Sequence, residues 1–305
     1  MKKVLIFSLV VTVFMTSVLL PLRAINADGE NEGLNNPNFQ KGSQPFPSLT
    51  AEEERLEEEK LQRYREWLSK QPKIDIKNFD MPISNDDSSK EPSILSITEY
   101  GSLTIYYRVQ ETSYYCGPAT AQVILNYDWG MIGSSNYYTQ SYLANYMGTN
   151  STDGTYVYRL KNALNELKNP NKNPTAYWIY TLLPSNETDA ANYLYTYLQN
   201  DITYNTTKQA LAFHTNTYPK YGYDAWGERY GLIGYYNPSN SYEYHSTGHY
   251  VTGYGYVLYS DGRHRVKYAD SWNHDYGWEN CLGYHELDAR NMATCINGNA
   301  GYLIW

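Results

Sequence analysis

The sequence predicts an α+β protein with a helical N-terminal lobe and an antiparallel β-sheet C-terminal lobe. Two observations support this fold class. Helical patterns dominate the first half of the folded region, whereas strand-like stretches rich in Tyr, Val and Gly dominate the second half. In addition, helices and strands occur as two successive blocks and do not alternate, which is typical of α+β folds. We therefore expect a cleft where the two lobes meet.

Residues 1–27 are predicted to be a signal peptide. Lys2 and Lys3 precede an apolar run, Val4–Leu20, and small residues follow in Ala24-x-x-Ala27. A retained membrane anchor is the alternative, because this run of 17 residues is at the lower limit of the ~17–25 residues that span a bilayer. Pro21 and the Ala-x-x-Ala sequence favour cleavage. We therefore expect a secreted or cell-surface protein without a membrane segment after cleavage.

Residues 28–93 are predicted to be a linker that contains one charged helix. Residues 28–49 are rich in Asn, Gly, Pro and Ser and lack apolar periodicity. The capping box Thr50-Ala-Glu-Glu53 predicts a helix over residues 51–70, which Pro72 ends. One face of this helix is apolar and needs a surface to pack against: Leu61, Tyr64, Trp67 and Leu68.

This helix has two possible roles. It could belong to an intramolecular propeptide and lie on the catalytic domain or fill its cleft. Alternatively, it could be a spacer that holds the enzyme away from a membrane or wall. Residues 73–92 are again polar and poorly patterned, so the catalytic domain is predicted to comprise residues 94–305.

The elements of the domain follow in order. A strand over residues 102–109 is expected to lead directly into Gln110. Helical patterns are found at 117–128, 139–147, 155–167 and 187–200. Strand-like patterns are found at 175–181, 209–215, 249–259, 264–270, 282–288 and 300–305.

Cys116 is the first candidate for a catalytic residue. Pro118 suits the first turn of a helix, because its missing N–H would have no partner there, and residues 119–127 continue as a mostly apolar helical run. Cys116 is thus expected at a helix N-terminus, where unpaired N–H groups stabilise the thiolate that attacks a carbonyl carbon. Gln110 can donate a side-chain N–H to the same point and form an oxyanion hole with the backbone N–H of Cys116. An inert buried thiol is the alternative.

His249 and Asp270 are the candidates for the base and for the group that orients it. His249 lies at the start of one predicted strand, and Asp270 lies at the end of the next. Two antiparallel strands joined by the turn 260–262 would bring these ends to one edge of the sheet. His249 would then exchange a proton with the thiol, and the Asp270 carboxylate would fix the ring tautomer through the other nitrogen.

Other titratable residues compete for these roles. His245 lies four residues before His249, and His264 lies in the next predicted strand. Asp261 and Asp275 are carboxylates near Asp270, but both fall in turn-like segments, so we expect solvated surface roles for them.

The cysteine count is odd, with three in the chain. This leaves Cys116 as the candidate free thiol. Cys281 and Cys295 could form a disulfide that closes a 15-residue loop and contributes ~3 kcal/mol of stability. The competing hypothesis is a metal site formed by Cys281, His285 and Cys295, although this spacing matches no common zinc pattern.

Three motifs together resemble the papain-like cysteine peptidases, which carry glutamine, cysteine, histidine and Asn/Asp in this order. The motifs are Gln110-x5-Cys116, His249-Tyr-Val-Thr-Gly-Tyr-Gly and Asp270-Ser-Trp-Asn. The block Cys116-Gly-Pro-Ala-Thr is similar to the C39-like branch of that clan, and the match covers about residues 100–305.

The resemblance implies a two-lobed papain-like fold with the active site between the lobes. It also implies a thioester acyl-enzyme and neither a metal nor an organic cofactor. Cys116 would be the nucleophile, His249 the general base and acid, Asp270 the orienting residue and Gln110 an oxyanion donor.

The charge balance argues against nucleic acid as a partner. Without residues 1–27 the chain has 21 basic and 32 acidic residues, a net charge of −11. No stripe of Lys or Arg would neutralise phosphates, and the six histidines are scattered. The 35 tyrosines are expected to fill half-buried strand surfaces, although a ligand surface for sugars or extended peptides is the alternative.

The sequence therefore predicts an exported cysteine peptidase that hydrolyses peptide or isopeptide bonds in a peptide, protein or cell-wall substrate. An acyltransferase would use the same triad but deliver the acyl group to an amine or thiol. A peptidoglycan-directed amidase or endopeptidase is a third enzymatic possibility. The non-enzymatic alternative is a cell-surface binding module that keeps the fold without turnover.

Overall fold

The computed structural model describes residues 48–70, 96–172, 176–224, 226–235, 246–276 and 280–305. All of these belong to one unit, Gln44–Trp305. The predicted signal peptide 1–27 lies outside the described residues, as do the linker residues 28–47 and 71–95. The described parts contain no helix that is long and apolar enough to cross a membrane.

Six α-helices form in the described residues, and their starts follow from local sequence. Thr50 and Glu53 form the predicted capping box of the first helix, in which each backbone N–H donates to the side chain of the other residue. Thr139, Asn186 and Asp288 cap later helices with their side-chain oxygens. The helices are α1 (Ala51–Lys70), α2 (Cys116–Asp128), α3 (Gln140–Met147), α4 (Val157–Leu167), α5 (Glu187–Gln199) and α6 (Ala289–Asn297), with a π-helix η2 (Asn200–Tyr204) and a 3₁₀ turn η3 (His274–Tyr276).

Seven strands form one antiparallel sheet. They are β1 (Ile97–Ser102), β2 (Tyr180–Leu182), β3 (Leu211–Asn216), β4 (Gly248–Tyr259), β5 (His264–Asp270), β6 (Gly283–Asp288) and β7 (Tyr302–Ile304). The order is β2-β7-β3-β4-β5-β6. The central strand β4 is long enough to pair with β3 along residues 248–253 and with β1 along residues 255–259. The hairpin β4–β5 has the predicted turn, in which Gly262 adopts a φ of +85°.

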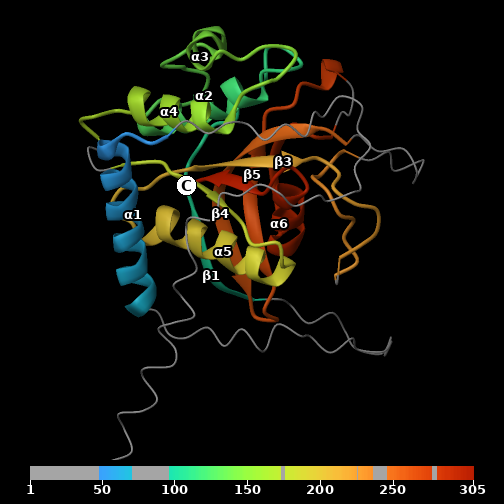
Figure 1. The fold of residues 1–305 in the computed structure, drawn as a ribbon. Coiled ribbons are helices and arrows are strands. Elements are labelled where there is room, and N and C mark those ends of the chain that lie inside the picture. Colours follow the sequence, from blue (N-terminus) through green and yellow to red (C-terminus); the bar gives the residue numbers. More distant parts are fainter. Residues whose placement is uncertain (1–47, 71–95, 173–175, 225, 236–245, 277–279) are drawn as a thin grey trace, which may run out of the picture. The chain divides into compact units, whose positions relative to one another are not determined.

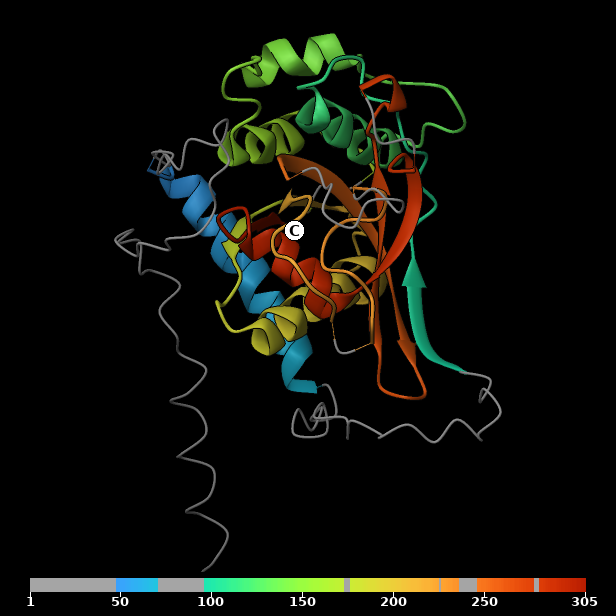
Figure 2. The same cartoon turned by 90° about the vertical axis from the view of Figure 1, so that its right-hand side faces the viewer.

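The helices lie in two groups around this sheet. The helix α2 packs against α3, α4 and β4, and Figure 1 shows these three helices together at one end of the sheet. The helices α5 and α6 pack against each other and against β4 and β3, and they cover one face of the sheet in Figure 2. The predicted α+β class, with a helical N-terminal lobe and an antiparallel C-terminal sheet, is therefore confirmed.

Two predicted strands differ from the structure, and one helix was not predicted. The strand expected at 102–109 is instead β1 (Ile97–Ser102), which pairs with β4, and the strand expected at 175–181 is reduced to β2 (Tyr180–Leu182). The helix α6 was not predicted at all. Its signals were present, since Asp288 is a good N-cap residue and the apolar side chains of Met292, Cys295 and Ile296 recur at helical spacing.

The helix α1 is anchored to the rest of the unit by a buried lysine. Lys60 is 2% exposed, and its ammonium donates to the backbone oxygen of Tyr177 at 2.9 Å and to Asp201 Oδ2 at 3.0 Å. It also lies 4.6 Å from the ring centroid of Trp305. Burial lowers the pKa of Lys60, and the Asp201 carboxylate opposes that shift. A buried ammonium needs such a partner, so this contact fixes the position of α1 along the domain.

Three of the four residues of the predicted apolar face of α1, namely Leu61, Tyr64 and Trp67, pack on the core, whereas Leu68 is exposed. Tyr64 is buried, its hydroxyl lies 2.8 Å from Thr196 Oγ1 on α5, and its ring contacts those of Tyr197 and Trp305. Trp305 itself is fully buried and exchanges two backbone hydrogen bonds with Ile179.

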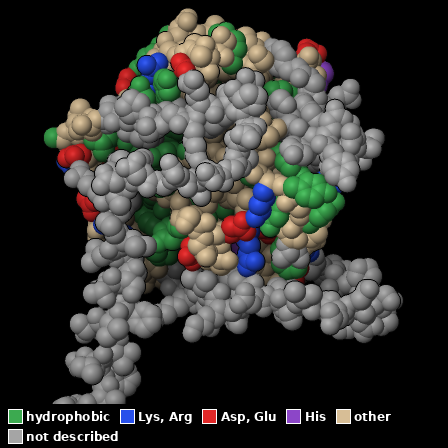
Figure 3. Space-filling model, turned by 45° about the vertical axis from the view of Figure 1, so that its right-hand side comes forward, with side chains coloured by type: hydrophobic (Ala, Val, Ile, Leu, Met, Phe, Trp, Pro, Cys, Tyr) green, Lys and Arg blue, Asp and Glu red, His purple; other side chains and the backbone are tan. Residues whose placement is uncertain are grey.

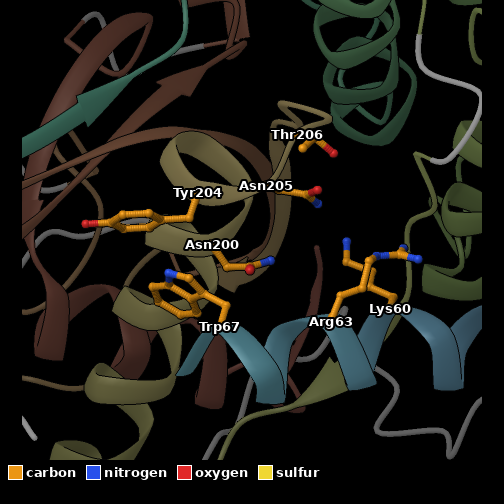
Figure 4. A pocket seen from close by; sticks show the side chains of 7 residues that line it. All are labelled: Lys60, Arg63, Trp67, Asn200, Tyr204, Asn205 and Thr206. Carbon is orange, nitrogen blue, oxygen red and sulfur yellow. The ribbon is translucent and has the colours of Figure 1, made fainter. Parts of the chain in front are cut away.

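Cavities lie on both sides of this contact. One of about 160 Å³ lies between α1 and η2, where Figure 4 shows Lys60 and Arg63 side by side, facing Asn205 and Thr206. Another, of about 130 Å³, lies beside Lys161. Neither is lined by Cys116, His249 or Asp270. On the face seen in Figure 3, acidic and basic side chains lie in small mixed groups.

Candidate active site

Cys116 is the first residue of α2, as the sequence predicts. The preceding Tyr115 makes no side-chain cap, so the N–H groups of the first turn are not bonded by a capping side chain. Nearly every residue of α2 from Gly117 to Asn126 is buried, which holds the helix axis, while Cys116 itself stays partly exposed. The helix therefore presents the Cys116 side chain at its N-terminus, next to the backbone N–H groups of its first turn.

His249 and Asp270 meet at the same end of two neighbouring central strands. His249 is the second residue of β4, Asp270 is the last residue of β5, and His249 Nε2 lies 2.8 Å from Asp270 Oδ1. Both side chains are buried, at 1% and 0% exposure. The Asp270 carboxylate also accepts from the backbone N–H of Trp272 at 2.8 Å and from the Tyr235 hydroxyl at 3.2 Å. These bonds fix the carboxylate, and the carboxylate fixes the imidazole.

The electrostatics of His249 link it to Cys116. Burial lowers the pKa of His249, but the charge and hydrogen bond of Asp270, together with Cys116, raise it by more, to about 10. No hydrogen bond of ordinary geometry to the second ring nitrogen, Nδ1, is found among the described residues, but Cys116 raises the pKa of the ring partly through a side-chain hydrogen bond, so its thiol lies within reach of the imidazole. With Nε2 held by Asp270, Nδ1 is the nitrogen available to exchange a proton with the thiol.

Two aromatic rings enclose the imidazole. The rings of Trp272 and Tyr235 each lie 5.7 Å from His249 between centroids. Trp272 belongs to the motif Asp270-Ser-Trp-Asn. Tyr235 was missed, because the region around it carries no motif, and only its place in the fold brings it to Asp270.

Gln110 is buried between the sheet edge and the loop that leads to Cys116. Its backbone N–H donates to Ser271 at 2.7 Å, and its side-chain Nε2 donates to the backbone oxygen of Thr112 at 3.0 Å. One hydrogen of the amide nitrogen is thus used, which leaves the second for a substrate oxygen. Its role as an oxyanion donor stays a prediction.

The competing histidines and carboxylates lie elsewhere. His264 packs on Tyr195, and burial lowers its pKa to about 4. Asp261 pairs with Arg263 in the β4–β5 turn, and Asp275 is exposed in η3. His245 lies outside the described residues.

The proposed disulfide between Cys281 and Cys295 is wrong, because both are free, fully buried thiols. Cys295 lies on α6 and its sulfur approaches Asn291 Oδ1 at 3.8 Å, whereas Cys281 interacts with Tyr235. The alternative metal site is not assembled either. His285 Nε2 lies 2.6 Å from the backbone oxygen of Cys281, and the described residues contain no group of three or more His, Cys, Asp or Glu able to hold a metal.

Solved structures of cysteine proteases resemble this chain. The ragweed pollen allergen Amb a 11, a cysteine protease in its proform, is 13% identical, with 70% of this chain and 66% of that chain covered and a TM-score of 0.40. Digestive procathepsin L2 from Tenebrio molitor is 14% identical, with 85% and 94% covered and a TM-score of 0.40. Bromelain from Ananas comosus is 15% identical, with 68% and 98% covered and a TM-score of 0.36.

No protein-family model and no curated protein matches the chain. A structural similarity of this size decides nothing about activity, so a functional conclusion depends on the geometry of Cys116, His249 and Asp270.

The raised pKa of His249 predicts an alkaline limit to turnover. The ring keeps its proton below about 10 and loses it as the pH rises through that value. In an enzyme that uses His249 as the acid for a leaving amine, kcat/KM should fall there and not near the ordinary histidine pKa of about 6.5. Asp270→Asn removes the charge that opposes burial, so its basic limb should lie at lower pH. If the pH profiles of kcat/KM for the wild type and Asp270→Asn have the same basic limb, His249 paired with Asp270 is not the acid.

Proposed function

We propose that this chain is an exported cysteine peptidase of the papain-like clan, in its C39-like branch. The observation that carries the proposal is the buried His249–Asp270 pair, whose imidazole also interacts with the Cys116 side chain. A nucleophile, a base and an orienting group in this order constitute the catalytic unit of acyl transfer. Export is proposed from the signal sequence in residues 1–27 alone.

The reaction follows from these residues. The Cys116 thiolate attacks the carbonyl carbon of the scissile bond, and the oxygen becomes an oxyanion that accepts from the Cys116 backbone N–H and from Gln110 Nε2. The His249 imidazolium then gives its proton to the leaving amine, which departs and leaves a thioester on Cys116. Water, deprotonated by His249, attacks the thioester and releases the carboxylic acid and the thiolate.

Covalent labelling of the full chain tests the proposal. With E-64 or a peptidyl vinyl sulfone we expect one adduct, mapped to Cys116 by tryptic mass spectrometry, that forms much faster than with a model thiol. Cys281 and Cys295 serve as internal controls, because both are fully buried and burial raises their pKa values.

The outcomes of the labelling separate the alternatives. A Cys116 that reacts no faster than a model thiol would contradict the peptidase and support a surface binding module. With a labelled enzyme, turnover of unfolded proteins and of purified cell walls would distinguish a peptidase from a wall amidase. Product analysis with an added amine would detect acyl transfer.

A further inference from the structure

Tyr250, the residue after His249 on β4, contacts the helical lobe directly. It is 2% exposed, and its hydroxyl donates to the backbone oxygen of Thr155 at 2.9 Å. Thr155 belongs to the segment between α3 and α4, so this bond joins the sheet lobe to the helical lobe.

Thr155 in turn lies against the residue after Cys116. A Cβ atom at Gly117 would lie only 2.2 Å from Thr155 Oγ1 and 2.5 Å from Thr155 Cβ, so the threonine packs directly on the bare backbone of α2. Thr155 is buried, and its hydroxyl is held by Thr149 Oγ1 at 2.8 Å. The segment between α3 and α4 is therefore also fixed within the helical lobe.

We propose that the Tyr250–Thr155–Gly117 bridge is a positioning device that sets the separation of Cys116 and His249. Each end of the bridge is the chain neighbour of one member of the pair, and no other residue intervenes except Thr155. This inference rests on the proposed function of Cys116 and His249.

The bridge adds a fixed contact between the two lobes next to the site itself. His249 is held on the sheet by Asp270, and Cys116 lies on α2, which packs on β4. The Tyr250–Thr155–Gly117 contacts are the ones that join the chain neighbours of both groups. A shift of about 1 Å between reacting groups can cost about 100-fold in rate. A hydrogen bond that joins the residues next to both groups suppresses such shifts.

The Tyr250 ring is also held by a stacked histidine. The imidazole of His214, its cross-strand neighbour on β3, stacks on it with centroids 4.4 Å apart and planes at 16°. Burial lowers the pKa of His214 to about 3, so this ring stays neutral in the pH range of the tests below. The stack orients the Tyr250 ring. The hydrogen bond of the Tyr250 hydroxyl to Thr155 can be removed separately, because a phenylalanine lacks only the hydroxyl and keeps the ring.

The variant Tyr250→Phe tests the bridge, with Tyr256→Phe as the matched control. Tyr256 is a buried tyrosine on the same strand, and its hydroxyl lies 2.7 Å from Thr203 Oγ1. We expect Tyr250→Phe to lower the rate constant of Cys116 alkylation by about 10- to 100-fold and to move the acid limb of its pH profile to higher pH. Tyr256→Phe should change neither, and both variants should show cooperative thermal unfolding.

A second readout does not depend on activity. In NMR titrations of the His249 ring, the change caused by Cys116→Ala measures the coupling of the pair, and this change should be smaller in the Tyr250→Phe background than in the Tyr256→Phe background. Equal coupling in the two backgrounds would overturn the bridge, whether or not the wild type is reactive. A wild type that does not label would instead contradict the proposed function.

Discussion

Cys116→Ala should abolish turnover of any peptide substrate, with a loss in kcat on the order of 10⁶-fold, as when the nucleophile of a hydrolytic triad is removed. Without the sulfur no thioester forms, and His249 cannot substitute because it only moves the proton. Substrate affinity should change little, since alanine keeps the helix start and fills less space at a partly exposed position.

The measurement is a steady-state assay of the variant beside the wild type, with binding of an uncleaved peptide measured separately. Cys116→Ser is the matched control, because it retains a nucleophilic atom of similar size, and it should fall between the two. Turnover by Cys116→Ala above the level of an inactivated preparation would mean that the chemistry does not occur at this cysteine.

Lys60→Met should destabilise the folded unit by about 3–5 kcal/mol, which is the usual cost of removing one partner of a buried ion pair. The variant leaves the Asp201 carboxylate, which is 0% exposed, without its ammonium. It also removes the donor to the backbone oxygen of Tyr177 and the charge over the Trp305 ring. Denaturant unfolding followed by tryptophan fluorescence would measure the change.

Two further variants define this effect. The double variant Lys60→Met/Asp201→Leu removes both members of this ion pair, so no unpaired charge is buried at this contact. Most of the lost stability should therefore return. Arg55→Gln alters an exposed ion pair on the same helix and should change stability little. If Lys60→Met unfolds at the same denaturant concentration as the wild type, α1 is not docked in solution through this lysine.

The position of α1 bears on the two roles proposed for residues 28–93. Polar contacts of this helix reach α4, α5, η2, Tyr177 and Gln209, and in the described residues none of these contacts is made to Cys116, His249 or Asp270. Of the arrangements considered, the helix lying on the domain agrees with these contacts. Whether residues 28–93 act as a propeptide stays a prediction.

The sequence was most informative where function and local structure coincide. Pro118 and the apolar run after it placed Cys116 at a helix start, and the pattern around the 260–262 turn placed His249 and Asp270 at one sheet edge. Both inferences needed only neighbouring residues. The sequence was less informative for β1 and α6. The long strand β4 can pair with any of several nearby segments, and the apolar pattern of α6 is weak and follows directly on a strand.

Long-range pairing explains what else could not be predicted. Lys60 lies in a run of charged residues that is typical of a solvated helix face, and its burial depends on Asp201, which lies 141 residues later. Tyr235 reaches Asp270 only through the fold, and the Tyr250–Thr155 bond joins residues 95 positions apart. The distance between Cys281 and Cys295 in sequence likewise says nothing about the direction of their side chains.

All three cysteines are free thiols, so a change in redox conditions should affect the reactivity of Cys116 but not the stability of the fold. Oxidation of Cys116 to a sulfenic acid or a mixed disulfide would stop catalysis at the one partly exposed thiol, while the buried Cys281 and Cys295 are shielded. A reductant can therefore restore activity without weakening the fold, since no cross-link holds it. For the proposed exported peptidase, the redox potential of the surroundings would therefore switch catalysis reversibly and leave the stability of the fold unchanged.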